Sequence, residues 1–138
     1  MLFPAPTSTE IPAIKGLGID IAPISRIAAL VNRYDRNTLT LLFTADEIEQ
    51  CESAPQPHRY YAVCFATKEA VGKALGTGLV DINWNDIECS PIQTGLTIRL
   101  HAQAQRRAEA CGIQAWLATW CHWDDYVLVH VLAKGIEA

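Results

Sequence analysis

Asp20, Glu69 and Lys73 are the residues of this chain whose types and positions could carry chemistry. Asp20 interrupts an otherwise apolar segment, and a carboxylate in such a segment is unfavourable unless it is paired, hydrogen-bonded or bound to a cation. The pattern alone also allows two purely structural roles for Asp20. Asp20 could cap a helix that begins near Pro23, or it could pair with a nearby lysine.

A second group of residues indicates phosphate binding. Glu69 and Lys73 are four residues apart and share one helix face, so an ordinary surface ion pair worth roughly a few tenths of a kcal/mol is one explanation. Gly76 and Gly78 follow the same helix on either side of Thr77. A lysine one turn from a helix end, followed by a loop with two glycines, suits a phosphate that must be approached closely.

His122 lies at the expected end of a strand beside a turn, where a lone histidine is more often a surface residue than a ligand. Cys121 precedes it, but neighbours along a strand point to opposite faces, so this histidine is not placed to activate this thiol. The five cysteines are widely spaced and form no Cys-x-x-Cys pair. We therefore expect reduced thiols in a cytoplasmic protein, and no zinc site.

The segment around Asp20 alternates as a β-strand does. Residues 14–21 are therefore predicted to form a strand with one apolar face, made by Leu17, Ile19 and Ile21. The opposite face carries Gly16, Gly18 and Asp20. Two glycines and a carboxylate on one face leave room for another group to approach.

The remaining elements follow from hydrophobic periodicity, capping signals and turns. Helices are predicted over residues 24–34, 44–53, 58–75 and 102–111. Strands are predicted over residues 86–90, 96–100, 114–121 and 126–133, the last two as a hairpin. Because helices come first and antiparallel strands later, the predicted fold class is α+β. Residues 1–12 are expected to form a flexible N-terminal arm before a single domain of residues 13–138.

Composition excludes several classes of protein. Half of the 138 residues are hydrophobic and 19% are charged, which is an ordinary globular balance. The net charge of −4 argues against a general nucleic-acid binder. No apolar run is long enough for a membrane helix, and the N-terminus lacks the pattern of a secretory signal, so we expect no membrane partner.

Taken together, these motifs resemble one family, the holo-acyl-carrier-protein synthases, which are the small type of 4′-phosphopantetheinyl transferase. The resemblance extends over about residues 14 to 133. The matching segments are residues 16–21, Arg26-Ile27, Phe43-Thr44 with Glu47, residues 65–70, residues 73–78 and His122. The Gly-x-Asp pair and the Lys-Glu-Ala-x-x-Lys-Ala-x-Gly segment carry most of the specificity.

The resemblance implies a reaction and its site residues. Coenzyme A donates its phosphopantetheine arm to a serine of an apo acyl (or peptidyl) carrier protein, and 3′,5′-ADP leaves. The catalytic residues would be Asp20, Glu69 and Lys73. Asp20 and Glu69 would hold Mg²⁺ for the displacement at the pyrophosphate. The coenzyme A contacts would come from Lys73, Gly76, Gly78, His122 and Arg59. These carriers serve fatty acid, polyketide or nonribosomal peptide biosynthesis.

Partners also follow from the resemblance. Carrier proteins are acidic, so a net-acidic enzyme must offer them a local basic face. Arg26, Arg33 and Arg36 would give that face at the first helix, although a solvated helix face explains the same residues. The family further implies a homotrimer whose active sites lie between subunits, because larger single-chain transferases build one site from two similar halves.

Departures from the family pattern keep alternatives open. Cys64 stands where the family usually has an arginine, residues 119–121 replace its Ser-x-Ser, and Gln93 to Leu96 lack its Gly-Lys-Pro. These changes would weaken coenzyme A binding or alter the choice of carrier. One alternative is a catalytically weakened module that binds a carrier protein or coenzyme A. Another is a hydrolase of the coenzyme A pyrophosphate.

Overall fold

A computed structural model describes residues 11–91 and 95–137 of the chain. Its helices are α1 (Ile24–Arg33), α2 (Arg36–Leu39), α3 (Ala45–Ser53), α4 (Pro57–Ala74) and α5 (Ala102–Ala110). Its strands are β1 (Pro12–Pro23), β2 (Ile87–Pro91), β3 (Leu96–Leu100), β4 (Ile113–Trp123) and β5 (Tyr126–Ile136), with a 3₁₀ turn at Trp84–Asp86. The predicted α+β class is confirmed. Within the described residues, no helix is long and apolar enough to cross a membrane.

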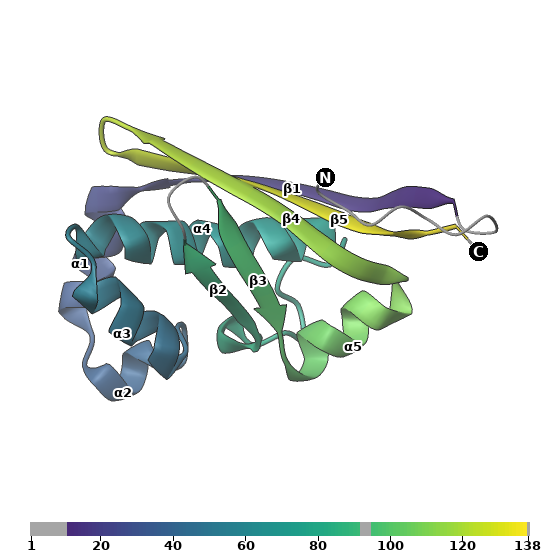
Figure 1. Ribbon diagram of the computed structural model, residues 1–138. Coiled ribbons are helices and arrows are strands. Elements are labelled where there is room, and N and C mark those ends of the chain that lie inside the picture. The colour runs from purple at the N-terminus through teal and green to yellow at the C-terminus, as the bar shows by residue number, and fades with distance from the viewer. Residues whose placement is uncertain (1–10, 92–94, 138) are drawn as a thin grey trace.

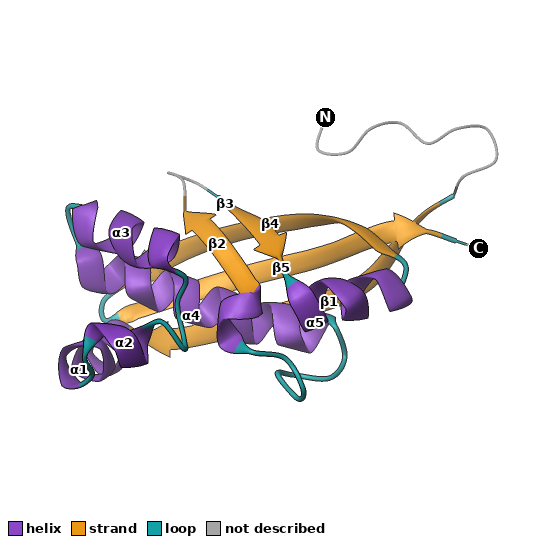
Figure 2. Cartoon of the chain, turned by 90° about the horizontal axis from the view of Figure 1, so that it is seen from below, coloured by secondary structure: helices purple, strands orange, loops and turns teal. Residues whose placement is uncertain are grey.

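The strands form one antiparallel sheet in the order β1-β5-β4-β3-β2. Figure 1 shows α4 running under the long strands, with α1, α2 and α3 at one end and α5 at the other. Figure 2, seen from below, shows that the helices lie on one side of the sheet. The core lies between this sheet face and α4, whose buried residues include Tyr61, Ala66 and Val71.

The glycine face of β1, which was expected to leave room for another group, packs against α4. A Cβ atom on Gly18 would lie 1.8 Å from the carbonyl oxygen of Ala70, and one on Gly16 would lie 2.0 Å from that of Ala74. The glycine face is therefore covered by the backbone of α4, and this helix is the group that approaches it. Only residues without a side chain permit such contact.

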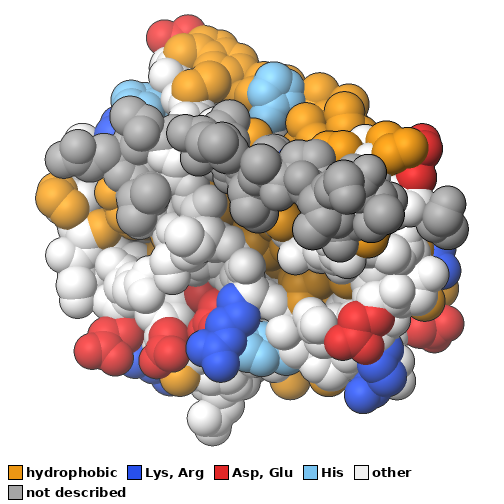
Figure 3. Space-filling view, turned by 45° about the vertical axis from the view of Figure 1, so that its right-hand side comes forward, with side chains coloured by type: hydrophobic (Ala, Val, Ile, Leu, Met, Phe, Trp, Pro, Cys, Tyr) orange, Lys and Arg blue, Asp and Glu red, His pale blue; other side chains and the backbone are white. Residues whose placement is uncertain are grey.

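The apolar face of β1 points away from the helices. Leu17, Ile19 and Ile21 are 58%, 41% and 50% exposed. Figure 3 shows hydrophobic side chains gathered along the upper part of the molecule, where the long strands lie in Figure 1. The alternation of β1 was predicted, but the face that meets the core is the small-residue face.

Local capping signals define the helix ends. The hydroxyl of Thr44 accepts a hydrogen bond from the backbone of Glu47, whose carboxylate accepts one from the backbone of Thr44, so a capping box begins α3, where capping signals predict a helix. Gly76 follows α4 with φ +80°, as expected for a residue just past a helix end. The four-residue helix α2 was not predicted.

Strand β1 is longer than the predicted strand because β5 pairs with it along its whole length, from Pro12 with Ile136 to Pro23 with Tyr126. The predicted arm of residues 1–12 falls largely outside the described residues. Residues 11 and 12 are described: Pro12 begins β1, and the carbonyl of Ile11 accepts a hydrogen bond from Glu137.

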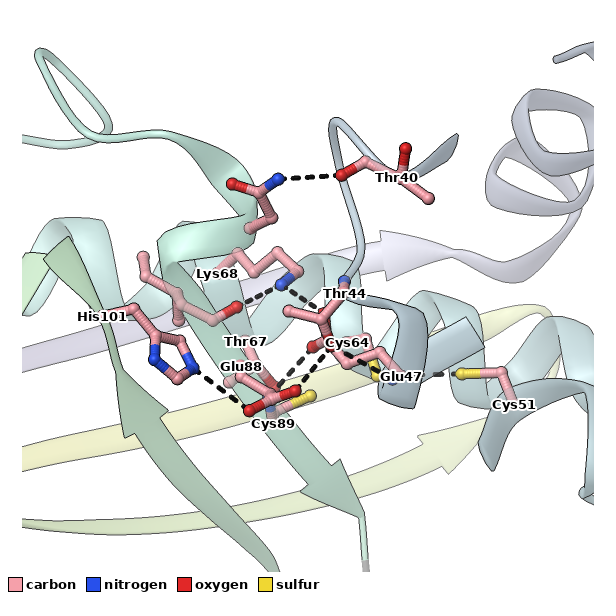
Figure 4. A network of polar contacts seen from close by, with 12 residues as sticks. Thr40, Thr44, Glu47, Cys51, Cys64, Thr67, Lys68, Glu88, Cys89 and His101 are labelled. Carbon is pink, nitrogen blue, oxygen red and sulfur yellow. Dashed lines mark hydrogen bonds and ion pairs between the residues drawn. The ribbon is translucent and has the colours of Figure 1, made fainter. Parts of the chain in front are cut away.

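A buried ion pair fixes α4 against its neighbours. Lys68 and Glu47 have fully buried side chains, and the Lys68 ammonium lies 2.8 Å from a Glu47 carboxylate oxygen. Lys68 also donates to the carbonyl of Ile87, while the second carboxylate oxygen of Glu47 accepts the backbone N–H of Cys89 at 2.9 Å. Figure 4 shows this network joining α4, α3 and β2. The residue that follows Lys68 on α4 is Glu69, so the network also fixes the helix that carries this site residue.

Candidate active site

Asp20 and Lys73 come together where β1 crosses α4. The Lys73 ammonium lies 3.1 Å from Oδ1 of Asp20 and donates a second hydrogen bond, at 2.9 Å, to the carbonyl of Ile19. The Asp20 side chain is mostly buried, at 18% exposed, whereas the Lys73 side chain is 52% exposed. Of the two structural explanations for Asp20, the pairing with a lysine is therefore the one observed. The half-exposed ammonium keeps access to a ligand in solvent.

Glu69 lies on the same side of α4, one turn before Lys73. Burial raises the pKa of Glu69 above its ordinary value, and the negative charge of Asp20 raises it further. The positive charges of Lys73 and Arg26 act in the opposite direction. The two carboxylates are thus close enough to repel each other, which is the electrostatic situation that a bound cation relieves.

The donor set of this cluster suits a hard divalent cation. Mg²⁺ takes oxygen ligands and is commonly held by one or two carboxylates together with waters and substrate phosphates. Asp20 and Glu69 supply carboxylate oxygens that are partly exposed, and no thiol or imidazole groups with them in the described part of the chain. These residues therefore fit Mg²⁺ better than zinc.

The loop of Gly76, Thr77 and Gly78 folds back onto α4. The N–H of Gly78 donates to the carbonyl of Gly72 at 3.0 Å, and a Cβ on Gly72 would lie only 2.9 Å from the backbone of Gly78. Gly76 and Gly78 both have positive φ, +80° and +61°. These glycines thus have a structural explanation in addition to the predicted phosphate contact, which stays a prediction.

The three predicted docking arginines are all exposed, but they do not share one helix. Arg26 and Arg33 lie on α1, at its start and end, while Arg36 begins α2. Arg36 pairs with Glu52 at 2.9 Å. The expectation that the first helix carries all three was wrong, because the chain turns at Asp35, whose side chain caps α2.

His122 and Arg59 are not joined to the acidic cluster within this chain. His122 is exposed near the end of β4, with its ring centroid 6.0 Å from that of Trp120. Arg59 lies in the first turn of α4, and its Nε is a buried nitrogen without a hydrogen-bond partner in the described part of the chain. No hydrogen bond or ion pair between the described residues connects either side chain to Asp20, Glu69 or Lys73.

Three features near the site were not predicted from the sequence. Lys68 lies within the motif of residues 65–70, but no local signal in the sequence indicates its burial against Glu47. Asp125 caps α1 from a turn far along the chain. Cys64, where the resemblance leads us to expect an arginine, is fully buried beside Cys51, with the two sulfur atoms 3.8 Å apart. A side chain at position 64 therefore points into the core of this protomer.

Comparisons with known proteins agree with the fold and with the predicted family. The family described as the 4′-phosphopantetheinyl transferase superfamily matches residues 16–129, which include the acidic cluster. A holo-acyl-carrier-protein synthase of Solibacter usitatus is 34% identical over 124 residues, covering 88% of this chain and 99% of that protein. The chain belongs to the holo-acyl-carrier-protein synthases within this superfamily.

Solved structures support the same assignment. The synthase of Neisseria meningitidis has a TM-score of 0.76 at 27% identity, covering 88% of this chain and 98% of that one. The synthase of Helicobacter pylori, solved in complex with coenzyme A, has a TM-score of 0.70 at 27% identity, covering 88% and 99%. The predicted family and fold are confirmed.

Proposed function

We propose that this chain transfers the 4′-phosphopantetheine arm of coenzyme A to a serine of an apo acyl carrier protein and releases 3′,5′-ADP. The observation that carries the proposal is the meeting of Asp20, Glu69 and Lys73 within the fold of this family. A relative of the same fold was solved with coenzyme A, which supports the donor.

In this reaction the serine oxygen forms a bond to the phosphorus that carries the pantetheine, and the pyrophosphate P–O bond breaks. Asp20 and Glu69 would hold Mg²⁺, which supplies positive charge against the phosphate oxygens. Lys73 would move its ammonium from Asp20 to a phosphate oxygen, since its side chain is half exposed and Asp20 would then have the cation as a partner. The serine proton passes to a water or to an adjacent carboxylate.

The carrier would dock at α1. The chain as a whole has a net charge of −4, so an acidic partner needs a local patch of positive charge. Arg26 and Arg33 are exposed on this helix, and Arg26 lies near enough to Glu69 to lower its pKa. A carrier held at Arg26 would therefore have its serine close to the acidic cluster.

We also infer a homotrimer with sites between subunits. The outer face of β1, β5 and β4 has a mostly apolar hollow of about 300 Å³, lined by residues of all three strands, among them Leu17, Leu117 and Leu132, with Thr119 and His130 beside them. Single exposed apolar residues are ordinary, whereas a mostly apolar hollow shared by three strands indicates an interaction surface. Because His122 and Arg59 do not reach the acidic cluster of their own chain, a neighbouring copy would supply them.

The test is intact-protein mass spectrometry of an apo carrier protein incubated with this chain, coenzyme A and Mg²⁺. We expect a mass gain of one phosphopantetheine arm that disappears with EDTA. The assay is run under reducing conditions, because all five cysteines in the described residues are free. Free thiols also support a cytoplasmic site of action. No gain on several carriers would refute the transferase and favour a weakened binding module.

A further inference from the structure

Helix α1 begins without a side-chain cap of its own. Pro23 occupies the position before the helix, and no acidic residue lies in the first turn. The first N–H groups of an α-helix have no partner inside the helix and are satisfied by capping groups, water or ligands. The cap of α1 therefore has to come from another part of the chain.

Asp125, in the turn between β4 and β5, supplies this cap. The backbone N–H of Ile24 donates to the Asp125 carbonyl at 2.6 Å, and that of Ser25 donates to Oδ1 of Asp125 at 3.0 Å. The Ser25 hydroxyl donates to Oδ2. The carboxylate also lies at the positive end of the helix dipole, which favours its charge. Because Ser25 and Asp125 are 100 residues apart in sequence, the contact joins two separate elements.

Both of these elements carry residues with a proposed role in substrate binding. Arg26 follows Ser25 on α1 and is the docking arginine near the acidic cluster. His122 lies three residues before Asp125 on β4. The Asp125 carboxylate thus stands between the element proposed to bind the carrier and the element proposed to bind coenzyme A.

Packing of the buried Ile27 holds the middle of α1 in the core, so Asp125 acts at the start of this helix. The pairing of β1 with β5 ends at Pro23 and Tyr126, immediately before α1 begins. Beyond that point, three hydrogen bonds run from the start of α1 to the hairpin, and all three end on Asp125. Two of the three use its side chain, so removing that side chain leaves one backbone hydrogen bond.

We propose that Asp125 is a positioning residue that fixes the carrier-docking helix α1 to the β4–β5 hairpin. The inference rests on the proposed function, since it requires the carrier to bind α1. Loss of the side chain would let the start of α1 shift relative to the hairpin, and the carrier would be held less well. Coenzyme A binding would change little, because Asp125 contacts α1 rather than the predicted coenzyme A residues.

The first experiment measures steady-state transfer with Asp125→Ala and Asp125→Asn. We expect Asp125→Ala to raise the KM for the apo carrier about fivefold, the effect of losing a typical helix cap. The KM for coenzyme A should stay within about twofold of the parent. Asp125→Asn should stay closer to the parent than Asp125→Ala, because its single amide oxygen can still accept the backbone N–H of Ser25. The matched control is Asp124→Asn, which removes a charge at the neighbouring position without touching the cap.

A second variant separates positioning from simple helix stability. Pro23→Asp combined with Asp125→Ala gives α1 a cap of its own, without the link to the hairpin. Hydrogen exchange should show the start of α1 protected again, while the carrier KM stays high. Full recovery of the carrier KM would overturn the inference, and so would a parental KM in Asp125→Ala. If the parent protein transfers no phosphopantetheine, the proposed function is refuted together with this inference. If the parent is active and Asp125→Ala has the parental carrier KM, the inference alone is refuted.

Discussion

The substitution Gly18→Ala tests how the acidic cluster is built. A Cβ at position 18 would lie 1.8 Å from the carbonyl oxygen of Ala70, whereas Cβ atoms essentially never approach another heavy atom within 3.0 Å. The backbones of β1 and α4 would therefore have to separate by about 1.2 Å. Neither backbone can avoid the clash by rotating a side chain.

The expected loss of stability lies at the upper end of overpacking effects, about 3 kcal/mol. For a chain of this size, that lowers Tm by roughly 10 °C. Asp20 lies two residues away on the same strand face, so its carboxylate would also move relative to Glu69. A misplacement of about 1 Å at a reacting site can reduce the rate roughly 100-fold.

The assay combines thermal unfolding by circular dichroism with the transfer assay at a temperature where the variant is folded. Gly95→Ala is the control, because its Cβ would lie 3.3 Å from the nearest carbonyl oxygen and the residue is outside the acidic cluster. We expect that control to change Tm by only about 1–2 °C. A Gly18→Ala protein that keeps the parental Tm and the parental rate would refute the close-contact explanation.

Other predictions address charge at the site and around it. Glu69→Gln should reduce transfer at least about 100-fold with an unchanged circular dichroism spectrum, because one carboxylate of the proposed metal pair is lost; full activity would refute the metal assignment. Arg26→Glu should raise the carrier KM about five- to tenfold, with little change in the KM for coenzyme A, and equal carrier affinity in titrations would contradict the docking proposal. Burial by itself raises the pKa of Glu88, but hydrogen bonds from Thr44 and His101 outweigh it, so the net pKa lies below its ordinary value. A carboxylate with a lowered pKa stabilises the fold above its ordinary pKa, and this stabilisation is lost as the pH falls through the folded-state value. Glu88→Gln should therefore be less stable than the parent at pH 7, and the difference in Tm should shrink near pH 3; a constant difference across pH would rule out this linkage.

Local signals in the sequence were sufficient for most elements of the fold. The capping box at Thr44 and Glu47 and the glycine at position 76 act within one helical turn, so their geometry follows from spacing alone. The alternation in β1 was equally readable. The alternation does not show which face of β1 is covered. Small residues face the core only where another backbone comes close, and here that backbone is α4, about fifty residues away in sequence.

The parts of the site that could not be predicted depend on long-range contacts. Lys68 has no neighbour in sequence that explains its burial, because its partners Glu47 and Ile87 come from α3 and β2. Asp125 looks like an ordinary turn residue, and its cap on α1 becomes visible only when the hairpin meets that helix. A helix preceded by Pro23 without a capping side chain was the available signal that such a partner exists.

The glycine face of β1 has a consequence for redesign of this protein. Asp20 and Glu69 are carried by two main chains that touch directly at Gly18 and Ala70, with no side chain layered between them. The distance between the two carboxylates is thus fixed by direct contact between the backbones of β1 and α4. Core residues elsewhere, such as those between α4 and α1, can be exchanged for others of similar volume while this spacing is kept. Thermostable variants should therefore be sought by substituting core residues away from the crossing of β1 and α4, with Gly16 and Gly18 unchanged.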